Sequence, residues 1–266
     1  MTYQQLFEKL RQKPMSEAQF YTYVKNIGGL YADIASELEL LKGSGAPLYV
    51  QKHNGESYFS LSTQHQEWQK GNLVFVDIET NGAKPQQCQI IEIGALKVKG
   101  GEIIDKFESY VYADEVPENI TQLIGICQAD IAYAPSIKEV LGEFRAFLGT
   151  DVFVAHNVNF DYGFVDYHLR QCGLFGLLNP KLCTIELAKK TILSPRYALG
   201  FLNEFLGIRT AVTHRAYADA LTSFRVFEIA SMMFPPFVKS MQDLIDFSKG
   251  RLKLDYTTPF IYQNKH

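Results

Sequence analysis

The sequence predicts an α/β protein in which helices cover the faces of a mixed β-sheet, preceded by a small α+β module. From residue 72 onward, apolar β-type runs alternate with amphipathic helical patterns, as in layered α/β folds. Before residue 72, three helical patterns are followed by a short hairpin. The chain has 266 residues, 47% apolar and 21% charged, which favours a globular core over disorder. We expect a module at 1–71, a main domain at 72–231 and a tail at 232–266.

The first region resembles a winged-helix module in its order of elements. Apolar residues recur with helical spacing over 5–11, 16–25 and 31–42. Two short strands then flank Asn54-Gly55, a dipeptide that favours a tight hairpin turn. Three helices followed by a hairpin therefore predict a winged-helix-like fold.

The charge of this module argues against DNA reading. Its acidic and basic side chains balance, and the third helix carries Asp33, Glu37 and Glu39 against Lys42. A helix that enters the major groove needs cations to meet the phosphates. We therefore expect the module to contact another protein or to act as a scaffold.

The main domain begins with a buried strand over 73–79 and a hairpin that turns at Gly100-Gly101. A capping box at Ser136 starts an amphipathic helix that ends at 148. The remaining expected elements are a strand over 151–157, a helix over 160–172, a strand over 181–185 and a helix over 215–232. Strands and helices alternate throughout, so one layered sheet is expected.

Composition narrows the cellular setting. The four cysteines include no C-x-x-C pair, and free thiols in a reducing compartment are expected. No run approaches the ~18 apolar residues needed to cross a bilayer, and the first residues lack the apolar core of a signal peptide. These features predict a cytoplasmic protein with no membrane contact. The net charge of −3 points to no particular partner.

A pair of carboxylates ends the first strand of the main domain. Asp77 and Glu79 are two residues apart, so both side chains lie on one face of the sheet. Adjacent carboxylates repel each other unless a cation lies between them, and carboxylate oxygens suit Mg²⁺ or Mn²⁺. Alone, such a pair is also common at solvated strand ends.

Two further acids and a histidine stand out. Asp161 follows the second buried strand and lies between Phe160 and Phe164, although an acid at a helix start is ordinary by itself. His214 and Asp219 are five residues apart, about 500° of helix rotation. They converge only if the helix begins just after His214. Read alone, His214 is equally consistent with an ordinary loop histidine.

The order and spacing of these groups resemble the DEDDh 3′→5′ exonuclease superfamily, which includes the epsilon subunit of DNA polymerase III. The resemblance covers about residues 72–231 and is closest to the epsilon subunit and its free-standing relatives. Five motifs carry it: D-x-E-T-x-G at 77–82, I-I-E-I-G-A at 90–95, H-N-x-x-F-D-x-G-F at 156–164, C-T-x-E-L-A at 183–188 and H-R-A-x-x-D-A at 214–220.

The resemblance implies a ribonuclease-H-like fold with a five-stranded mixed sheet. It also implies that Asp77, Glu79, Asp161 and Asp219 bind two divalent metal ions, Mg²⁺ or Mn²⁺. His214 would act as the general base, because imidazole takes up a proton near neutrality. The expected reaction removes nucleoside 5′-monophosphates from the 3′ end of DNA, in proofreading or repair.

The resemblance also suggests contacts to the terminal nucleotide. The implied contacts are Thr80, Ile124, Asn157 and Phe160. Asn81 departs from the threonine usual in epsilon-type motifs, which leaves the detailed contact with the 3′ end open. An exoribonuclease of the same fold, and an inactive binding module of a polymerase or repair complex, are the alternatives. A polymerase or another protein is expected to bind the module or the tail, where residues 242–247 predict an inward-facing amphipathic helical turn.

Overall fold

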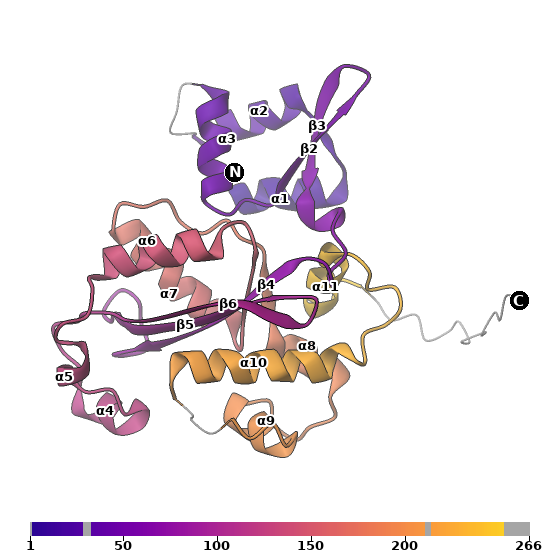
Figure 1. The fold of residues 1–266 in the computed structure, drawn as a ribbon. Helices are drawn as coiled ribbons and strands as arrows, with labels where there is room; N and C mark the ends of the chain where they lie inside the picture. The colour runs from indigo at the N-terminus through magenta and orange to yellow at the C-terminus, as the bar shows by residue number, and fades with distance from the viewer. Residues whose placement is uncertain (1, 29–32, 211–213, 253–266) are drawn as a thin grey trace, which may run out of the picture.

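The computed structural model describes residues 2–28, 33–210 and 214–252 and shows a small α+β module seated on a larger α/β domain (Figure 1). The elements of the module are α1 (Tyr3–Gln12), β1 (Met15–Ser16), α2 (Glu17–Ile27), α3 (Ile34–Gly43), β2 (Leu48–His53), β3 (Glu56–Leu61) and the 3₁₀ turn η1 (Ser62–Gln64). Its strands form an antiparallel sheet in the order β1-β3-β2. The two-residue strand β1 is too short for the sequence to predict. Residues 31–32 of the expected third helix lie outside the described residues.

The expected hairpin is confirmed, and its turn explains the dipeptide. Asn54 and Gly55 have φ angles of 51° and 84°, the left-handed pair that a two-residue turn requires. Phe20 of α2 stacks on Phe59 of β3 at 4.1 Å between ring centroids, in the core of the module. Glu37 of α3 is only 3% exposed and accepts a hydrogen bond from Tyr3, so this charge lies inside the module.

The main domain has the expected mixed five-stranded sheet. Its strands are β4 (Asn72–Thr80), β5 (Ile90–Lys99), β6 (Glu102–Tyr110), β7 (Val152–Ala155) and β8 (Lys181–Cys183), in the order β6-β5-β4-β7-β8. The pairs within β4–β6 are antiparallel, and β7 and β8 continue the sheet in parallel. Gly100 and Gly101, both with positive φ, form the predicted turn. The expected strand over 181–185 is shorter, because its last two residues begin a helix.

Helices cover both faces of this sheet. Along β4, Val74, Val76 and Ile78 face one layer, formed by α6 (Ile137–Leu148) and α7 (Val158–Gln171). Leu73 and Phe75 face the other layer, which contains α10 (Ala216–Ser231). The further helices of the domain are α4 (Glu118–Ile124), α5 (Gln128–Ile131), α8 (Thr184–Thr191), α9 (Leu199–Phe205) and α11 (Met241–Ser248). The three-layer α/β/α arrangement matches the expectation for 72–231.

The segment expected as a tail contributes to the core. Residues 241–248 form α11, whose apolar side chains Leu244, Ile245 and Phe247 are buried against the sheet. The inward-facing helical turn predicted over 242–247 is confirmed. Its apolar face and the sheet bury each other, so this part of the chain is a structural element of the domain. Residues 253–266 lie outside the described residues.

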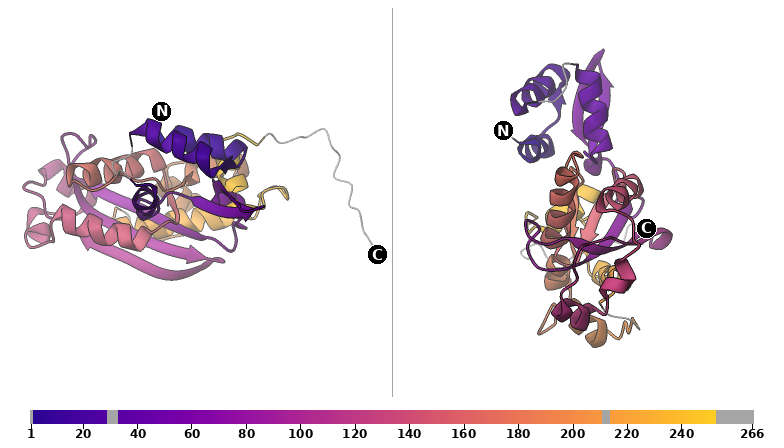
Figure 2. Two further views of the ribbon diagram at one scale, coloured as in Figure 1. Left: turned by 90° about the horizontal axis from the view of Figure 1, so that it is seen from above. Right: turned by 90° about the vertical axis from the view of Figure 1, so that its left-hand side faces the viewer.

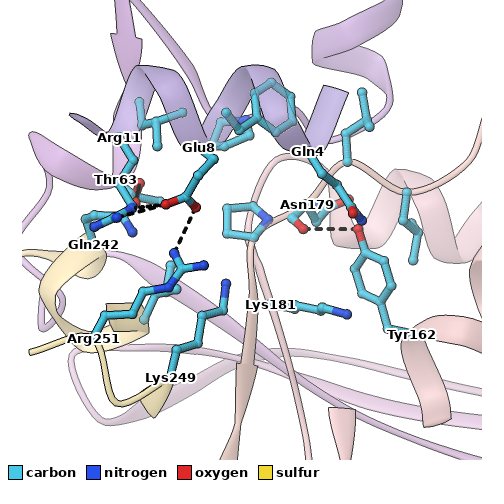
Figure 3. Close-up of a pocket in the computed structure, with 17 residues that line it drawn as sticks. Gln4, Glu8, Arg11, Thr63, Tyr162, Asn179, Lys181, Gln242, Lys249 and Arg251 are labelled. Carbon is cyan, nitrogen blue, oxygen red and sulfur yellow. Dashed lines mark hydrogen bonds and ion pairs between the residues drawn. The ribbon is translucent and has the colours of Figure 1, made fainter. Parts of the chain in front are cut away.

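The module docks on the domain through polar and apolar contacts. Figure 2 shows it as a separate lobe at one side of the sheet layers. Arg11 pairs with Asp246 at 3.1 Å, and Thr63 donates a hydrogen bond to Gln242 at 2.7 Å (Figure 3). Leu178 of the domain packs into the module core. These contacts fix how the module sits on the domain.

The four cysteines are free thiols in this structure. Among the described residues, no helix combines the length and the apolar character that a membrane crossing requires.

Candidate active site

Asp77 and Glu79 lie at the end of β4, on the face that α10 covers. Side chains alternate along the strand, so both share the face of Leu73 and Phe75. The register places Gly94 of β5 directly opposite Asp77, and Glu92 opposite Glu79. The sequence prediction that the two acids share one face is therefore consistent with the strand geometry.

Gly94 lets the first turn of α10 lie directly on the sheet. A Cβ atom at Gly94 would fall 2.0 Å from the backbone nitrogen of Tyr217 and 2.2 Å from the carbonyl carbon of Ala216. These are backbone atoms of α10, so no side-chain rotation relieves the contact. Only glycine permits this approach, which brings the acids of β4 and the start of α10 together.

An ion pair anchors the same end of α10. Glu92 is 7% exposed, and its carboxylate accepts hydrogen bonds from Arg215 at 2.7 Å and from the Ala216 backbone N–H at 3.0 Å. The guanidinium of Arg215 also lies 5.3 Å from the ring centroid of Tyr110. Glu92 therefore fixes the residues between His214 and Asp219.

His214 and Asp219 converge as the sequence requires. α10 begins at Ala216, so His214 stands on the preceding loop, exposed and with a φ of 60°. Its backbone N–H donates to the Asp219 carboxylate at 3.1 Å. One ligand atom each from Glu79, His214 and Asp219 lie within 4.8 Å of one another. These three side chains form a group that can hold a metal ion.

Asp161 approaches from the other helical layer. It lies in the first turn of α7 and is 3% exposed. Its negative charge is among those that raise the pKa of the Asp77 carboxyl. Asp161 therefore points inward, as do the aromatic residues beside it in the sequence, and is not a solvated acid at a helix start.

The carboxyl groups resist ionisation together. Burial and the charges of Asp161, Glu79, Asp219 and Glu92 raise the pKa of Asp77 well above its usual range. Burial and the neighbouring acids raise the pKa of Glu79 to about 8. Burial also raises the pKa of Asp161 to about 7 and that of Asp219 above its usual range. A cluster of this kind favours occupation by cations.

His156 follows β7 and contacts two segments next to the site through its two ring nitrogens. Its Nε2 lies 2.8 Å from the carbonyl oxygen of Tyr197, which can only accept, so Nε2 carries the proton. Nδ1 then accepts from the Thr184 hydroxyl at 2.8 Å. Burial lowers the pKa of His156 to about 4, and the ring is neutral. It ties the end of β7 to the start of α8.

The four residues expected to contact the substrate differ in how far their side chains are exposed. Asn157 is exposed with a φ of 80°, next to the start of α7, and Phe160 is half-buried against Phe164. Thr80 uses its hydroxyl to donate to the Gly82 carbonyl at 2.7 Å. Ile124 is 7% exposed and packs inside a small apolar cluster, whereas its neighbour Leu123 is 60% exposed.

Asn81, the position that departs from the related motif, has a structural role. Its side chain donates to the Glu115 carbonyl at 2.9 Å and accepts from the Gln89 backbone N–H. It therefore closes the loop between β4 and β5 and joins it to the chain before α4.

Sequence reasoning missed Glu92, Gly94 and His156 as parts of the site. Two of them, Glu92 and Gly94, carry a signal in retrospect. Glu92 is an acid inside an otherwise apolar strand, where an unpaired charge is costly. Gly94 is a glycine in the middle of the same strand, typical of a close backbone approach. Their partners lie more than 120 residues away, so the sequence gives no sign of what they contact.

Comparisons with known proteins agree with this geometry. A family model for RNase T, described as Exonuclease, matches residues 74–227. The epsilon subunit of DNA polymerase III from Aquifex aeolicus is 35% identical over 159 residues, covering 59% of this chain and 79% of that protein. A PolC-type DNA polymerase III from Thermotoga maritima is 34% identical over 251 residues, covering 91% of this chain. The chain spans only 17% of the length of the Thermotoga protein.

Two solved structures share the fold. Escherichia coli exonuclease I in complex with a dA16 oligonucleotide gives a TM-score of 0.57 at 15% identity, over 64% of this chain and 42% of that one. Exonuclease X in complex with 5′-overhanging duplex DNA gives 0.50 at 20% identity, over 66% of this chain and 99% of that one. These two likenesses show the fold alone, whereas the family model matches more than half of the chain and shows that the protein belongs to the RNase T family of exonucleases.

Proposed function

We propose that this protein removes nucleotides one at a time from the 3′ end of DNA and releases nucleoside 5′-monophosphates. The observation that carries the proposal is the convergence of Asp77, Glu79, Asp161 and Asp219, from three separate elements, at one end of the sheet. His214 stands exposed beside them. The epsilon-type relative and the family match support the same reading.

Membership of the family implies divalent metal ions, and the residues present fit them. The four carboxylates are hard oxygen ligands with raised pKa values, and the nearby Arg215 is already paired with Glu92. We propose that these four side chains hold two ions, Mg²⁺ or Mn²⁺. Two bound ions would stabilise the attacking and the leaving oxygen of an in-line displacement.

The protein groups then have distinct roles. His214, on its exposed loop, takes the proton of the attacking water through its ring nitrogen. Glu92 and Arg215 hold the loop that presents it. Asn157, Phe160 and Thr80 border the site and are proposed to contact the terminal nucleotide by shape and stacking, which tolerate any base. Ile124, which is buried in its own apolar cluster, is proposed to support this pocket without touching the nucleotide.

We further propose the winged-helix type for the module, with the β2–β3 hairpin as its wing, and the divisions 1–71 and 72–231 as units of the chain, with α11 of the segment after residue 231 packed onto the second unit. The order helix, strand, two helices and hairpin supports this type. The match to the Thermotoga polymerase covers 91% of the chain and so extends into the module. The name of that relative, a DNA polymerase, supports a polymerase as a partner, and proofreading is the role that we propose with it.

One experiment tests the reaction. The protein is incubated with 5′-labelled single-stranded DNA, duplex DNA and RNA of one sequence in Mg²⁺ or Mn²⁺. We expect DNA to shorten stepwise from its 3′ end with nucleoside 5′-monophosphates as products, and no shortening with Asp77→Asn or in EDTA. Faster degradation of RNA than of DNA would favour an exoribonuclease instead. Activity of Asp77→Asn equal to wild type would overturn the site.

A further inference from the structure

A cleft lies where the module, β8 and the segment after α11 meet (Figure 3). Its volume is about 260 Å³, at the small end of ligand sites. Glu8 and Arg11 of α1 border it on the module side, and Lys181, Lys249 and Arg251 border it on the domain side. The cleft exists only because the module is docked.

The charges of this cleft are not balanced. Arg11 and Arg251 are neutralised, because they pair with Glu8 and Asp246 at 2.8–3.5 Å. Lys181 instead donates to the neutral side chain of Asn159 and lies 5.0 Å from the ring centroid of Tyr162. Neither of these partners is an acid, so Lys181 forms no ion pair among the described residues.

Lys249 completes the excess of positive charge. Within the described part of the chain it has neither an ion pair nor a side-chain hydrogen bond. Figure 3 shows its amino group reaching into the space beneath α1. Partial burial, together with the positive charges of Arg251 and Lys181, lowers the pKa of Lys249, although the carboxylates of Asp246 and Glu8 act in the opposite direction. Burial also lowers the pKa of Lys181. Lys181 and Lys249 therefore line one small cleft without an ion pair of their own, and the one carboxylate that also lines it, that of Glu8, is paired with Arg11 and Arg251.

We propose that this cleft is an anion site that takes the phosphate of a mononucleotide, with Lys181 and Lys249 as the binding cations. A phosphate monoester carries nearly two negative charges near neutral pH, which match two ammonium groups. The small volume suits a single nucleotide and not a folded partner. The choice of ligand rests on the proposed function, since that reaction releases nucleoside 5′-monophosphates.

The cleft is separate from the candidate active site. Lys181 is the first residue of β8, whereas the other end of that strand, Cys183, pairs with Ala155 just before His156. None of the carboxylates proposed to bind metal lines the cleft. A nucleotide bound in this cleft would therefore occupy a site other than the candidate active site. Tyr162, which lines the cleft, belongs to α7, the helix that carries Asp161.

Calorimetric titration of the full chain in EDTA tests the site, because EDTA removes the metal that the catalytic carboxylates would need to hold a phosphate. The probes are thymidine 5′-monophosphate, inorganic phosphate, thymidine and a twelve-nucleotide strand. We expect the monophosphate to bind, phosphate to bind more weakly, and thymidine not to bind. Lys249→Gln should weaken binding of the monophosphate about tenfold or more, as loss of one charged contact predicts. The matched control Lys99→Gln, on the exposed β5–β6 turn, should leave it unchanged.

The results separate this proposal from the reaction. Equal affinity of wild type and Lys249→Gln for the monophosphate would overturn the site. A wild-type protein that binds the twelve-nucleotide strand but not the monophosphate would also overturn it. A wild-type protein that degrades DNA but binds no monophosphate in EDTA refutes the cleft and leaves the proposed function intact. A protein that binds the monophosphate but degrades no nucleic acid refutes the function and supports the cleft as an anion site.

Discussion

Replacement of Gly94 by alanine tests whether the close approach of α10 to β5 builds the active site. The added Cβ would lie 2.0 Å from the Tyr217 nitrogen, and ordinary contacts begin near 3.4 Å, so strand and helix must separate by about 1.4 Å. The Glu92 hydrogen bond to the Ala216 N–H, at 3.0 Å, opposes this shift. The movement carries Asp219 away from Asp77 and Glu79.

The expected loss follows from this displacement. Misplacement of a catalytic group by about 1 Å costs roughly 10²-fold in rate, so kcat of Gly94→Ala should fall about 10²-fold. Overpacking of a core position destabilises by about 1–3 kcal/mol, which urea unfolding measures. Calorimetric titration with Mn²⁺ should also show weaker binding, because Asp219 is one of the proposed ligands.

A second glycine supplies the control. Gly142 lies inside α6, and a Cβ there would meet no atom within 4 Å. Gly142→Ala should therefore keep wild-type kcat and gain about 0.5–1 kcal/mol of stability from improved helix propensity. If Gly94→Ala kept wild-type kcat and Mn²⁺ affinity, the close approach would have no part in the geometry of the site.

Three other outcomes are expected. His214→Ala should lower kcat about 10²–10⁴-fold yet keep Mn²⁺ affinity in calorimetry, whereas lost affinity would make His214 a ligand. In EDTA, the folded protein keeps a proton on Glu79 up to about pH 8, while the unfolded chain releases it near 4.5; the Tm should therefore fall as the pH rises from about 4.5 to about 8, and Glu79→Gln should reduce this slope, because the raised pKa values of Asp77, Asp161 and Asp219 contribute the rest. Deletion of 1–70 should lower the Tm because Leu178 loses the module core, while kcat per folded molecule on a short strand stays near that of the full chain; a large drop in this kcat would place the module in catalysis.

Most of the sheet could be predicted because its signals are local. The apolar run of β4, the Gly100-Gly101 turn and the capping box at Ser136 each lie within a dozen residues. The short elements could not be predicted in this way. β1 has two residues and exists because β3 offers it a partner. α11 reads as a tail until the sheet face that buries it is known.

The same distinction holds for the candidate site. Strand periodicity was enough to place Asp77 and Glu79 on one face. Bringing His214 to Asp219 required that the helix begin after His214, as α10 does. The contact of Glu92 with Arg215 spans 123 positions and has no local signal. Ile124 shows that a sequence motif can also mislead. The resemblance implies that this residue touches the substrate, but its side chain is buried in a helix that packs on β5.

The arrangement of the acids explains why the supports around them are so rigid. Burial and mutual repulsion oppose ionisation of Asp77 and Glu79, so an unconstrained chain would move these side chains apart. The fold prevents this from both helical layers. Gly94 and the Glu92–Arg215 pair fix α10 on one face of the sheet, and Asp161 is buried in the first turn of α7 on the other. On the proposed metal binding, the free energy spent on holding these carboxyls together would become affinity for divalent cations, because bound cations would remove the repulsion that the fold maintains.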